Sequence, residues 1–329
     1  MHILLITPAS PGSKAGNRAT AERWKQLLES VGHSVDVITD YQGEPCDLFI
    51  ALHAWRSAGA VQRFRDTWPS TPLIVALTGT DIYQHQHLYP DATYGSMDRA
   101  DALIGLHDQV ANDIPERYQR KLITLRQSAD KPQVRGCSRT EPGQFNVCVI
   151  GHLREEKDSL RAAWASRHLP ESSEIIVSCA GKPHNDEWRE KALTESRENP
   201  RFRWLGELDK DRITNLMAIS NLMVISSVIE GGANVVSEAC RAGLPILASD
   251  ISGNRGLLGN DYPGYFPAKD DVALADLLLR AETDREFLAE LKGRVTALAE
   301  TFTPEAERQS LEQALALAVA NRGAVSLSG

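Results

Sequence analysis

The chain has 329 residues, 42% of them apolar and 24% charged, which is typical of a folded globular protein and disfavours collagen-like, coiled-coil and disordered chains. At about 150 residues per domain, this length predicts two domains. The 44 acidic side chains outnumber the 36 basic ones, giving a net charge of −8, and no long basic run occurs. This charge balance argues against nucleic acid as the main partner, but it allows a local basic pocket for a small phosphate ligand.

Membrane and export signals are also missing from the sequence. No apolar stretch approaches the roughly 20 residues that cross a bilayer, and the short apolar run after Met1 lacks the features of a signal peptide. The five cysteines are scattered without a CxxC pair, which favours free thiols. We therefore expect a cytoplasmic protein with no stable membrane association.

The first part of the chain alternates short β-branched runs with amphipathic stretches. Strands are predicted over 3–7, 34–39, 47–53, 73–79, 102–106 and 122–125, with helices over 19–32 and 60–68. Runs that are apolar on both faces are typical of parallel strands covered by helices on both sides. The alternation predicts an α/β domain with a doubly wound sheet.

A polar segment with two prolines and two glycines, 129–144, predicts a break between domains. Beyond it, strands are predicted over 145–151, 174–181, 202–206, 222–227 and 245–250, with helices over 212–220 and 233–243. The expected architecture is two tandem Rossmann-like doubly wound parallel-sheet domains, 1–135 and 136–302, with an interdomain cleft. A C-terminal helix, 303–329, is expected to pack back on the first domain.

Two helix starts are predicted near the C-terminus. Thr283 and Glu286 have the spacing of a capping box. Thr303 followed by Pro304 has the pattern of an N-cap and a first-turn proline.

The most informative segment is SSVIEGGANVVSEACRAGLP, residues 226–245. A glycine-rich turn joins a strand to a helix expected to begin near Ala233, where free backbone N–H groups suit a phosphate or a sugar oxygen. Gly231 and Gly232 allow a ligand to approach the backbone closely. The carboxylates of Glu230 and Glu238 can accept hydrogen bonds from sugar hydroxyls. An ordinary βα turn with acidic residues near the helix N-terminus is the alternative interpretation.

This segment resembles the donor-site signature of a large family of retaining glycosyltransferases with the GT-B fold. The resemblance implies that Glu230 contacts the sugar hydroxyls, that Glu238 holds the ribose, and that the amides of residues 231–234 face the sugar and phosphates. It implies a donor-binding set of Gly16, Gly151, Leu205, Gly231, Gly232, Ala233, Asn234, Val235 and Glu238.

The segment VIGHLREEKD, 149–158, supports the same resemblance. Gly151 and Lys157 match the family pattern, His152 stands at the family's arginine position, and Arg154 follows two residues later. A diphosphate leaving group needs fixed positive charge, because negative charge builds on it as the glycosidic bond breaks. The resemblance implies Lys157, Arg154 and Glu230 as catalytic residues, whereas a solvated surface loop is the alternative.

The first domain carries a different set of residues. Its first loop, 8–20, is not a GxGxxG motif, which disfavours a nicotinamide dehydrogenase. Many members of the resembled family have a histidine where this chain has Thr78. His53 and Arg56 follow the third predicted strand at the same edge, and a purely structural His53 is the alternative.

The motifs GNRAT, ALHAWRS, LTGTDIY, LRQSAD and GHLREEKD together resemble a narrower subfamily, the selenosugar synthases of selenoneine biosynthesis. The resemblance implies that selenophosphate attacks the anomeric carbon of a UDP-sugar, UDP-N-acetylglucosamine. Ionised selenophosphate needs no general base, which fits Thr78, but it needs cations. Lys14 and Arg126 are further cations at strand ends, and the proposed acceptor-binding set is Asn17, Arg18, His53, Arg56 and Thr78.

Two other functions stay open: a glycosyltransferase with a hydroxyl acceptor, and a non-catalytic nucleotide-sugar sensor. No metal and no cofactor other than the co-substrate UDP-sugar are expected. His85 and His87 form an H-x-H pattern but are predicted to be loop residues, and Asp270 and Asp271 do not form a D-x-D motif.

Overall fold

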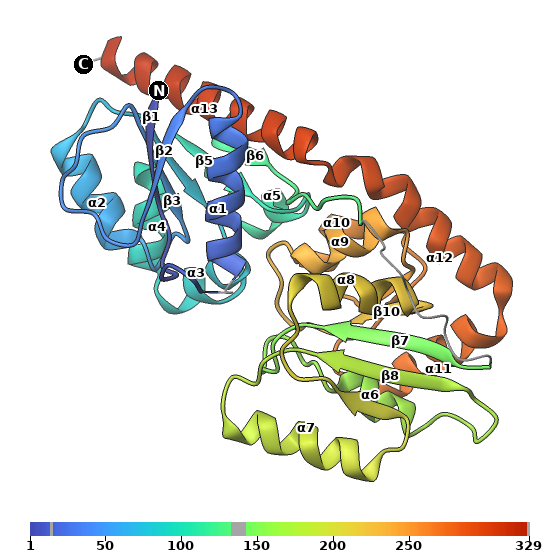
Figure 1. The fold of residues 1–329 in the computed structure, drawn as a ribbon. Helices are drawn as coiled ribbons and strands as arrows, with labels where there is room; N and C mark the ends of the chain where they lie inside the picture. Colours follow the sequence, from blue (N-terminus) through green and yellow to red (C-terminus); the bar gives the residue numbers. More distant parts are fainter. Residues whose placement is uncertain (14–15, 133–142, 328–329) are drawn as a thin grey trace. The chain divides into compact units, whose positions relative to one another are not determined.

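The computed structural model of the chain describes residues 1–13, 16–132 and 143–327. The chain divides into two compact units, one comprising Met1–Gln127 with Pro304–Gly329 and the other Ser128–Thr303. Each unit contains a six-stranded sheet whose strand pairs are all parallel (Figure 1). The predicted α/β fold with two doubly wound parallel sheets is confirmed.

The sheet of the first unit has the order β2-β1-β3-β4-β5-β6. Its strands are β1 (His2–Ile6), β2 (Ser34–Ile38), β3 (Leu48–Leu52), β4 (Leu73–Ala76), β5 (Ala102–Gly105) and β6 (Leu122–Thr124). Its helices are α1 (Gly16–Glu29), α2 (Ala58–Thr67), η1 (Asp81–His85), α3 (Gln86–Leu88), α4 (Pro90–Arg99), α5 (Val110–Asp113), η2 (Glu116–Lys121) and α13 (Pro304–Leu327). The chain runs from β1 outward to β2 and then back to β3, so the order reverses between β1 and β3.

Side chains of each strand alternate between two apolar layers, as the period of two in a β-strand requires. Ile3 and Leu5 pack in one layer with Trp24 of α1 and Leu311 of α13. Leu4 and Ile6 pack in the other layer with residues of α2 and α4. Both faces of the sheet are therefore buried at its centre, which explains why β3, β4 and β5 are apolar throughout, whereas the edge strand β2 contains the exposed Asp36.

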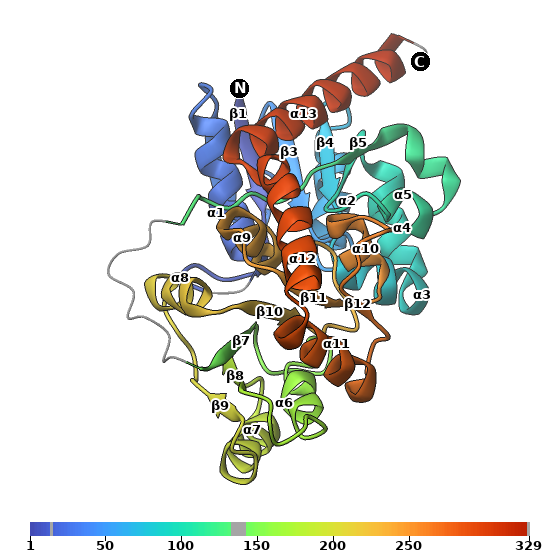
Figure 2. The same cartoon turned by 90° about the vertical axis from the view of Figure 1, so that its right-hand side faces the viewer.

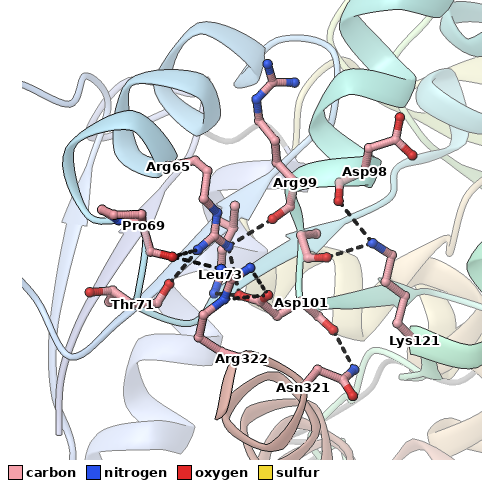
Figure 3. Close-up of polar contacts among 11 residues, drawn as sticks. Arg65, Pro69, Thr71, Leu73, Asp98, Arg99, Asp101, Lys121, Asn321 and Arg322 are labelled. Carbon is pink, nitrogen blue, oxygen red and sulfur yellow. Dashed lines mark hydrogen bonds and ion pairs between the residues drawn. The ribbon is translucent and has the colours of Figure 1, made fainter. Parts of the chain in front are cut away.

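Helix α13 packs against α1 and against β4, β5 and β6 (Figure 2). A polar cluster contacts α13 near its C-terminal end (Figure 3). The buried Asp101 carboxylate accepts hydrogen bonds from Arg65 Nη2 at 2.8 Å and from Arg322 Nε at 2.9 Å. Asn321 Nδ2 donates to the Asp101 carbonyl at 2.8 Å. This carboxylate therefore ties Arg322 of α13 to Arg65 of α2 within the first unit.

The sheet of the second unit has the order β12-β11-β10-β7-β8-β9. Its strands are β7 (Phe145–Ile150), β8 (Ile175–Ala180), β9 (Phe202–Trp204), β10 (Leu222–Ile225), β11 (Ile246–Ser249) and β12 (Tyr265–Phe266). Its helices are α6 (Arg161–Ser166), α7 (Asp186–Glu198), α8 (Lys210–Ile219), α9 (Asn234–Ala242), α10 (Ser252–Leu258), α11 (Asp271–Thr283), α12 (Arg285–Leu298) and η3 (Ala299–Phe302). The strand order reverses between β7 and β10.

The predicted capping box at Thr283 is wrong by one residue. Helix α11 continues through Thr283, whose hydroxyl donates to the Leu279 carbonyl at 2.7 Å. The Asp284 side chain caps α12 instead, accepting from the amides of Glu286 and Phe287. A carboxylate directly after α11 takes the capping role, because it can bond both amides at the start of the next helix.

Within the described ranges, no helix is long and apolar enough to span a bilayer.

Candidate functional site

The second unit presents its loops at the edge where β7 and β10 lie side by side. These two strands pair in parallel, with Leu222 opposite Val147 and Met223 opposite Cys148. Strand β7 is followed by β8 on one side of this pair, and β10 is followed by β11 on the other side. Ligands in open α/β sheets bind outside the carboxyl ends of the strands at such a reversal. The loops 151–160 and 226–233 therefore occupy the position expected of a ligand site.

Lys157 and Glu230 form an ion pair between these two loops. The Glu230 side chain is only 7% exposed and that of Lys157 is 22% exposed. Ser227 Oγ also donates to Glu230 Oε1, at 2.6 Å. The backbone of the two loops is joined as well, because Val228 N donates to the Glu156 carbonyl at 2.9 Å. The structure thus brings together two of the three predicted catalytic residues and fixes the carboxylate of Glu230.

Two glycines allow the backbone segments of this region to approach closely. A Cβ atom on Gly181 would lie 1.8 Å from the Gly151 carbonyl oxygen, so any side chain there would push the β7 and β8 loops apart. A Cβ atom on Gly253 would lie 2.2 Å from the Glu230 carbonyl oxygen. The positions of Gly151 and Glu230 therefore depend on glycines elsewhere in the sequence.

The third predicted catalytic residue, Arg154, has the most exposed side chain of the three. Its side chain is 44% exposed, and its Nε lies 3.7 Å from Glu156 Oε2. Burial, together with the nearby charge of Arg154, lowers the pKa of His152. His152 therefore stays neutral at neutral pH, unlike an arginine at that position.

The predicted donor residues 231–235 surround the start of α9. The helix begins at Asn234 with Ala233 as its N-cap, and Gly232 has a φ of 134°, a backbone conformation that favours glycine. Asn234, Val235 and Glu238 are partly exposed, whereas Gly231 and Ala233 are buried. Leu205 is 40% exposed after β9. Gly16 belongs to the other unit, where it begins α1.

In the first unit, His53 and Thr78 both contact Asp81. His53 Nδ1 lies 2.7 Å from Asp81 Oδ1, and the amide and hydroxyl of Thr78 each donate to Asp81 Oδ2 at 3.0 Å. Burial on its own would raise the pKa of Asp81, but the hydrogen bond from His53 holds it below its usual value. His53 has a φ of 76°, an uncommon conformation for a residue other than glycine.

The predicted acceptor cations differ in their environments. Arg18 pairs with Glu22 in the next turn of α1, and its buried Nη1 has no hydrogen-bond partner among the described residues. The Arg56 side chain is exposed, and Arg126 pairs with Asp108. Asn17 follows Gly16 in α1, and its carbonyl accepts a weak bond from the Thr7 hydroxyl at 3.4 Å. Lys14 lies outside the described residues.

The sequence interpretation missed Asp81 and its neighbour His85, and it was wrong to place His85 and His87 in a loop. His85 ends η1 and is buried, whereas His87 lies in α3 and is exposed. Asp81 and His85 are four residues apart, a spacing that puts two side chains on one face of a helix. That spacing was the available signal, but the segment lacks the apolar periodicity that identifies a helix.

Comparisons with known proteins agree with this architecture. The sequence model of a family described as glycosyl transferases group 1 matches residues 130–296, about half of the chain. Over 148 residues, the chain is 28% identical to the UDP-Gal:alpha-D-GlcNAc-diphosphoundecaprenol alpha-1,3-galactosyltransferase of Escherichia coli. That match covers 43% of this chain and 37% of the curated relative, well under half of the relative's length.

Two solved structures resemble the whole chain. HepE of Anabaena, solved in complex with UDP, has a TM-score of 0.75 and 17% identity, covering 96% of this chain and 100% of the other. The sucrose-phosphate synthase of Thermosynechococcus elongatus also has a TM-score of 0.75 and 17% identity, covering 95% of this chain and 97% of the other. At this level of identity, the resemblance establishes the fold.

Proposed function

Because the chain belongs to the glycosyl transferases group 1 family, we propose that it transfers a sugar from a UDP-sugar to selenophosphate. The sugar is N-acetylglucosamine, and the product is a selenosugar with a carbon–selenium bond, as in selenoneine biosynthesis. The observation that carries the proposal is the placement of Lys157 and Glu230 at the strand reversal, inside the segment that the family model matches.

The donor half of the proposal is supported by charge and by the relatives. The names of the Escherichia coli relative and of HepE complexes contain UDP-Gal, UDP and UDP-glucose. Lys157 supplies a positive charge beside the loops where a diphosphate would lie, with Arg154 as a second, more exposed cation. The start of α9 offers backbone N–H groups to phosphate oxygens. Glu230 is held in place to accept hydrogen bonds from sugar hydroxyls.

The acceptor half is supported by the groups around Thr78. Both the amide and the hydroxyl of Thr78 bond to Asp81, so this side chain is no base for a sugar hydroxyl. An ionised selenophosphate requires none, because it is already a strong nucleophile. Arg18, with its unpartnered buried Nη1 among the described residues, and the exposed Arg56 are the proposed ligands of its phosphate group.

The proposed reaction has two bond exchanges. The selenium atom of selenophosphate attacks C1 of the sugar, the bond from C1 to the diphosphate oxygen breaks, and UDP leaves with the electron pair. Positive charge at Lys157 stabilises the leaving diphosphate. Water then cleaves the selenium–phosphorus bond, releasing orthophosphate and the selenol of the sugar.

The test is an anaerobic reaction of the purified protein with UDP-N-acetylglucosamine and selenophosphate. Mass spectrometry looks for the selenium isotope pattern at the selenosugar mass, and UDP release is followed in parallel. We expect a selenosugar in the wild type and in Lys210→Ala, a control whose side chain is 83% exposed, and its loss in Lys157→Ala. UDP release that occurs only with a hydroxyl acceptor would replace selenophosphate by an ordinary acceptor. Donor binding without UDP release under any condition would indicate a sensor.

The acceptor residues are tested separately through the KM for selenophosphate. We expect Arg56→Ala to raise this KM, whereas Arg63→Ala, which removes an exposed arginine paired with Asp40, leaves it unchanged. An unchanged KM in Arg56→Ala would remove Arg56 from the acceptor site without affecting the donor assignment.

A further inference from the structure

Three side chains with metal-ligating atoms converge beyond the carboxyl ends of β3 and β4. His53 follows β3, and Asp81 and His85 begin and end η1. One ligand atom from each residue lies within 4.8 Å of the other two. The group includes two imidazoles and one carboxylate, a donor set that suits first-row divalent transition metal ions.

The backbone that presents these side chains is irregular on both sides of the group. The segment Asp81–His85 is a π-helix, a form that is rare and often occurs at functional sites. His53 has a φ of 76°. An uncommon conformation persists only where its surroundings hold it in place. Here Asp81 provides that support, because its carboxylate accepts hydrogen bonds from the amides of Ala54 and Trp55 at 2.9 and 3.0 Å.

One ring nitrogen of the buried His85 has no hydrogen-bond partner among the described residues. His85 is 7% exposed, and this nitrogen is its buried Nδ1. The nearest acidic atom, Asp81 Oδ1, lies 3.9 Å away, too far for a hydrogen bond. The Trp55 ring covers His85 with its centroid 4.2 Å from the imidazole centroid, and Tyr89 stacks on Trp55 at 4.7 Å. An imidazole nitrogen buried without a partner is costly unless something binds it.

We propose that His53, Asp81 and His85 bind a divalent transition metal ion such as Zn²⁺. Ligands about 2.0–2.2 Å from a tetrahedral ion lie roughly 3.3 Å from one another. The present separations from Asp81 Oδ1, 2.7 Å to His53 Nδ1 and 3.9 Å to His85 Nδ1, lie on either side of that value. Small movements of the two imidazoles therefore create the site, and the ion displaces the proton between His53 and Asp81.

The role of the ion follows from its position. It would join the turn after β3 to η1, and so fix Arg56 and Thr78 on either side of it. Three protein ligands leave a fourth position open to water or an anion. All three ligands belong to the first unit. A test of metal binding therefore does not depend on the identity of the sugar acceptor.

The test uses full-length protein freed of metal by a chelator and titrated with Co²⁺ and Zn²⁺. We expect one equivalent of Co²⁺ to give the absorption bands of low-coordinate cobalt, and Zn²⁺ to displace it. The variant His85→Gln should weaken Co²⁺ binding at least tenfold. His87→Gln, which changes an exposed histidine two residues away, should leave binding unchanged. Loss of binding in His87→Gln with retention in His85→Gln would overturn the proposal.

A second measurement needs no variant. In wild-type protein with one equivalent of Co²⁺, paramagnetic shifts of histidine ring resonances should occur at His53 and His85. Shifts confined to His2 and His33, near the chain's amino terminus, would show an adventitious site and contradict the proposal. Absence of saturable binding at micromolar Co²⁺ and Zn²⁺ would contradict it as well.

Discussion

Each unit has an acidic side chain beyond the C-terminal ends of its parallel strands, Glu230 in the second unit and Asp81 in the first. The two carboxylates differ in their burial and in the groups that contact them. In the second unit, Glu230 contacts one hydroxyl and the ammonium group of the partly exposed Lys157. In the first unit, Asp81 is almost fully buried, and both of its oxygens accept several donors from the protein. Because Lys157 is partly exposed, we expect it to exchange this contact for a bound ligand at little cost. The donors around Asp81 instead fix the backbone that carries them.

Asp101 extends the same contrast to α13. Its side chain is 4% exposed and lies between Arg65 and Arg322 (Figure 3). The comparison therefore predicts that substitutions at Lys157 affect turnover more than stability, and that substitutions at Asp101 do the reverse.

The largest expected effect is that of Lys157→Ala on turnover. Removing one group that stabilises charge in a transition state costs about 10²–10³-fold in kcat. The denaturation midpoint should move less than in Asp101→Ala, because the Lys157 side chain is partly exposed and Ser227 still donates to Glu230. Kinetics of UDP release and denaturant titrations measure the two effects, with Lys210→Ala as the control. A loss of stability as large as that of Asp101→Ala would break the comparison.

The second prediction concerns the anchor of α13. Asp101→Ala leaves two arginines facing each other with no carboxylate between them, and should lower the free energy of unfolding by about 3–5 kcal/mol. The exposed pair of Asp40 and Arg63 provides a control, because Asp40→Ala should cost less than about 1 kcal/mol. Denaturant titrations followed by circular dichroism measure both. Equal denaturation midpoints for the two variants would show that the buried Asp101 contributes no more to stability than the exposed Asp40.

In the second unit, the close packing of Gly253 against the Glu230 backbone gives a third prediction. Gly253→Ala places a Cβ atom against the Glu230 carbonyl, and should cost about 1–3 kcal/mol of stability while weakening UDP binding. Gly293 in α12 has no atom within 4 Å of its added Cβ, so Gly293→Ala should stabilise the protein by up to about 1 kcal/mol. Calorimetric titration with UDP tests the pair. Unchanged UDP affinity in Gly253→Ala would separate this loop from nucleotide binding.

The smallest effect is a pH dependence from His152. Its pKa is lowered in the folded protein by burial and by Arg154, so the unfolded chain binds a proton more readily below about pH 6.5. Stability should therefore fall as the pH drops from about 6.5 towards the folded pKa. His152→Gln should remove this slope and leave stability at pH 8 unchanged. Parallel slopes in the two proteins would show that His152 does not contribute.

The sequence predicted the parts of this molecule whose signals are contiguous. Eleven predicted strand segments correspond to β1–β11, because most of them are short apolar runs. Strand β12 has only two residues, too few to form a recognisable run. The loop 226–233 and the start of α9 form one segment, so Glu230 and the glycines could be identified together.

The rest depended on contacts between distant residues. No local pattern shows that Lys157 pairs with Glu230, that Gly253 supports the Glu230 backbone, or that Asp81 gathers His53 and Thr78. The predicted position of the helix cap was wrong for a different reason. Thr283 and Asp284 are adjacent, and both residue types can cap a helix. The roles assigned to all the predicted site residues, Lys157 and Glu230 included, remain predictions.

Formation of the carbon–selenium bond is the most direct test of the proposed function. The protein would be mixed anaerobically with ⁷⁷Se-labelled selenophosphate and UDP-N-acetylglucosamine carrying ¹³C at C1, and followed by ⁷⁷Se NMR. The proposal predicts a new selenium signal split by coupling to C1, which appears with UDP and is absent in Lys157→Ala. Release of UDP while all selenium remains uncoupled to carbon would contradict it.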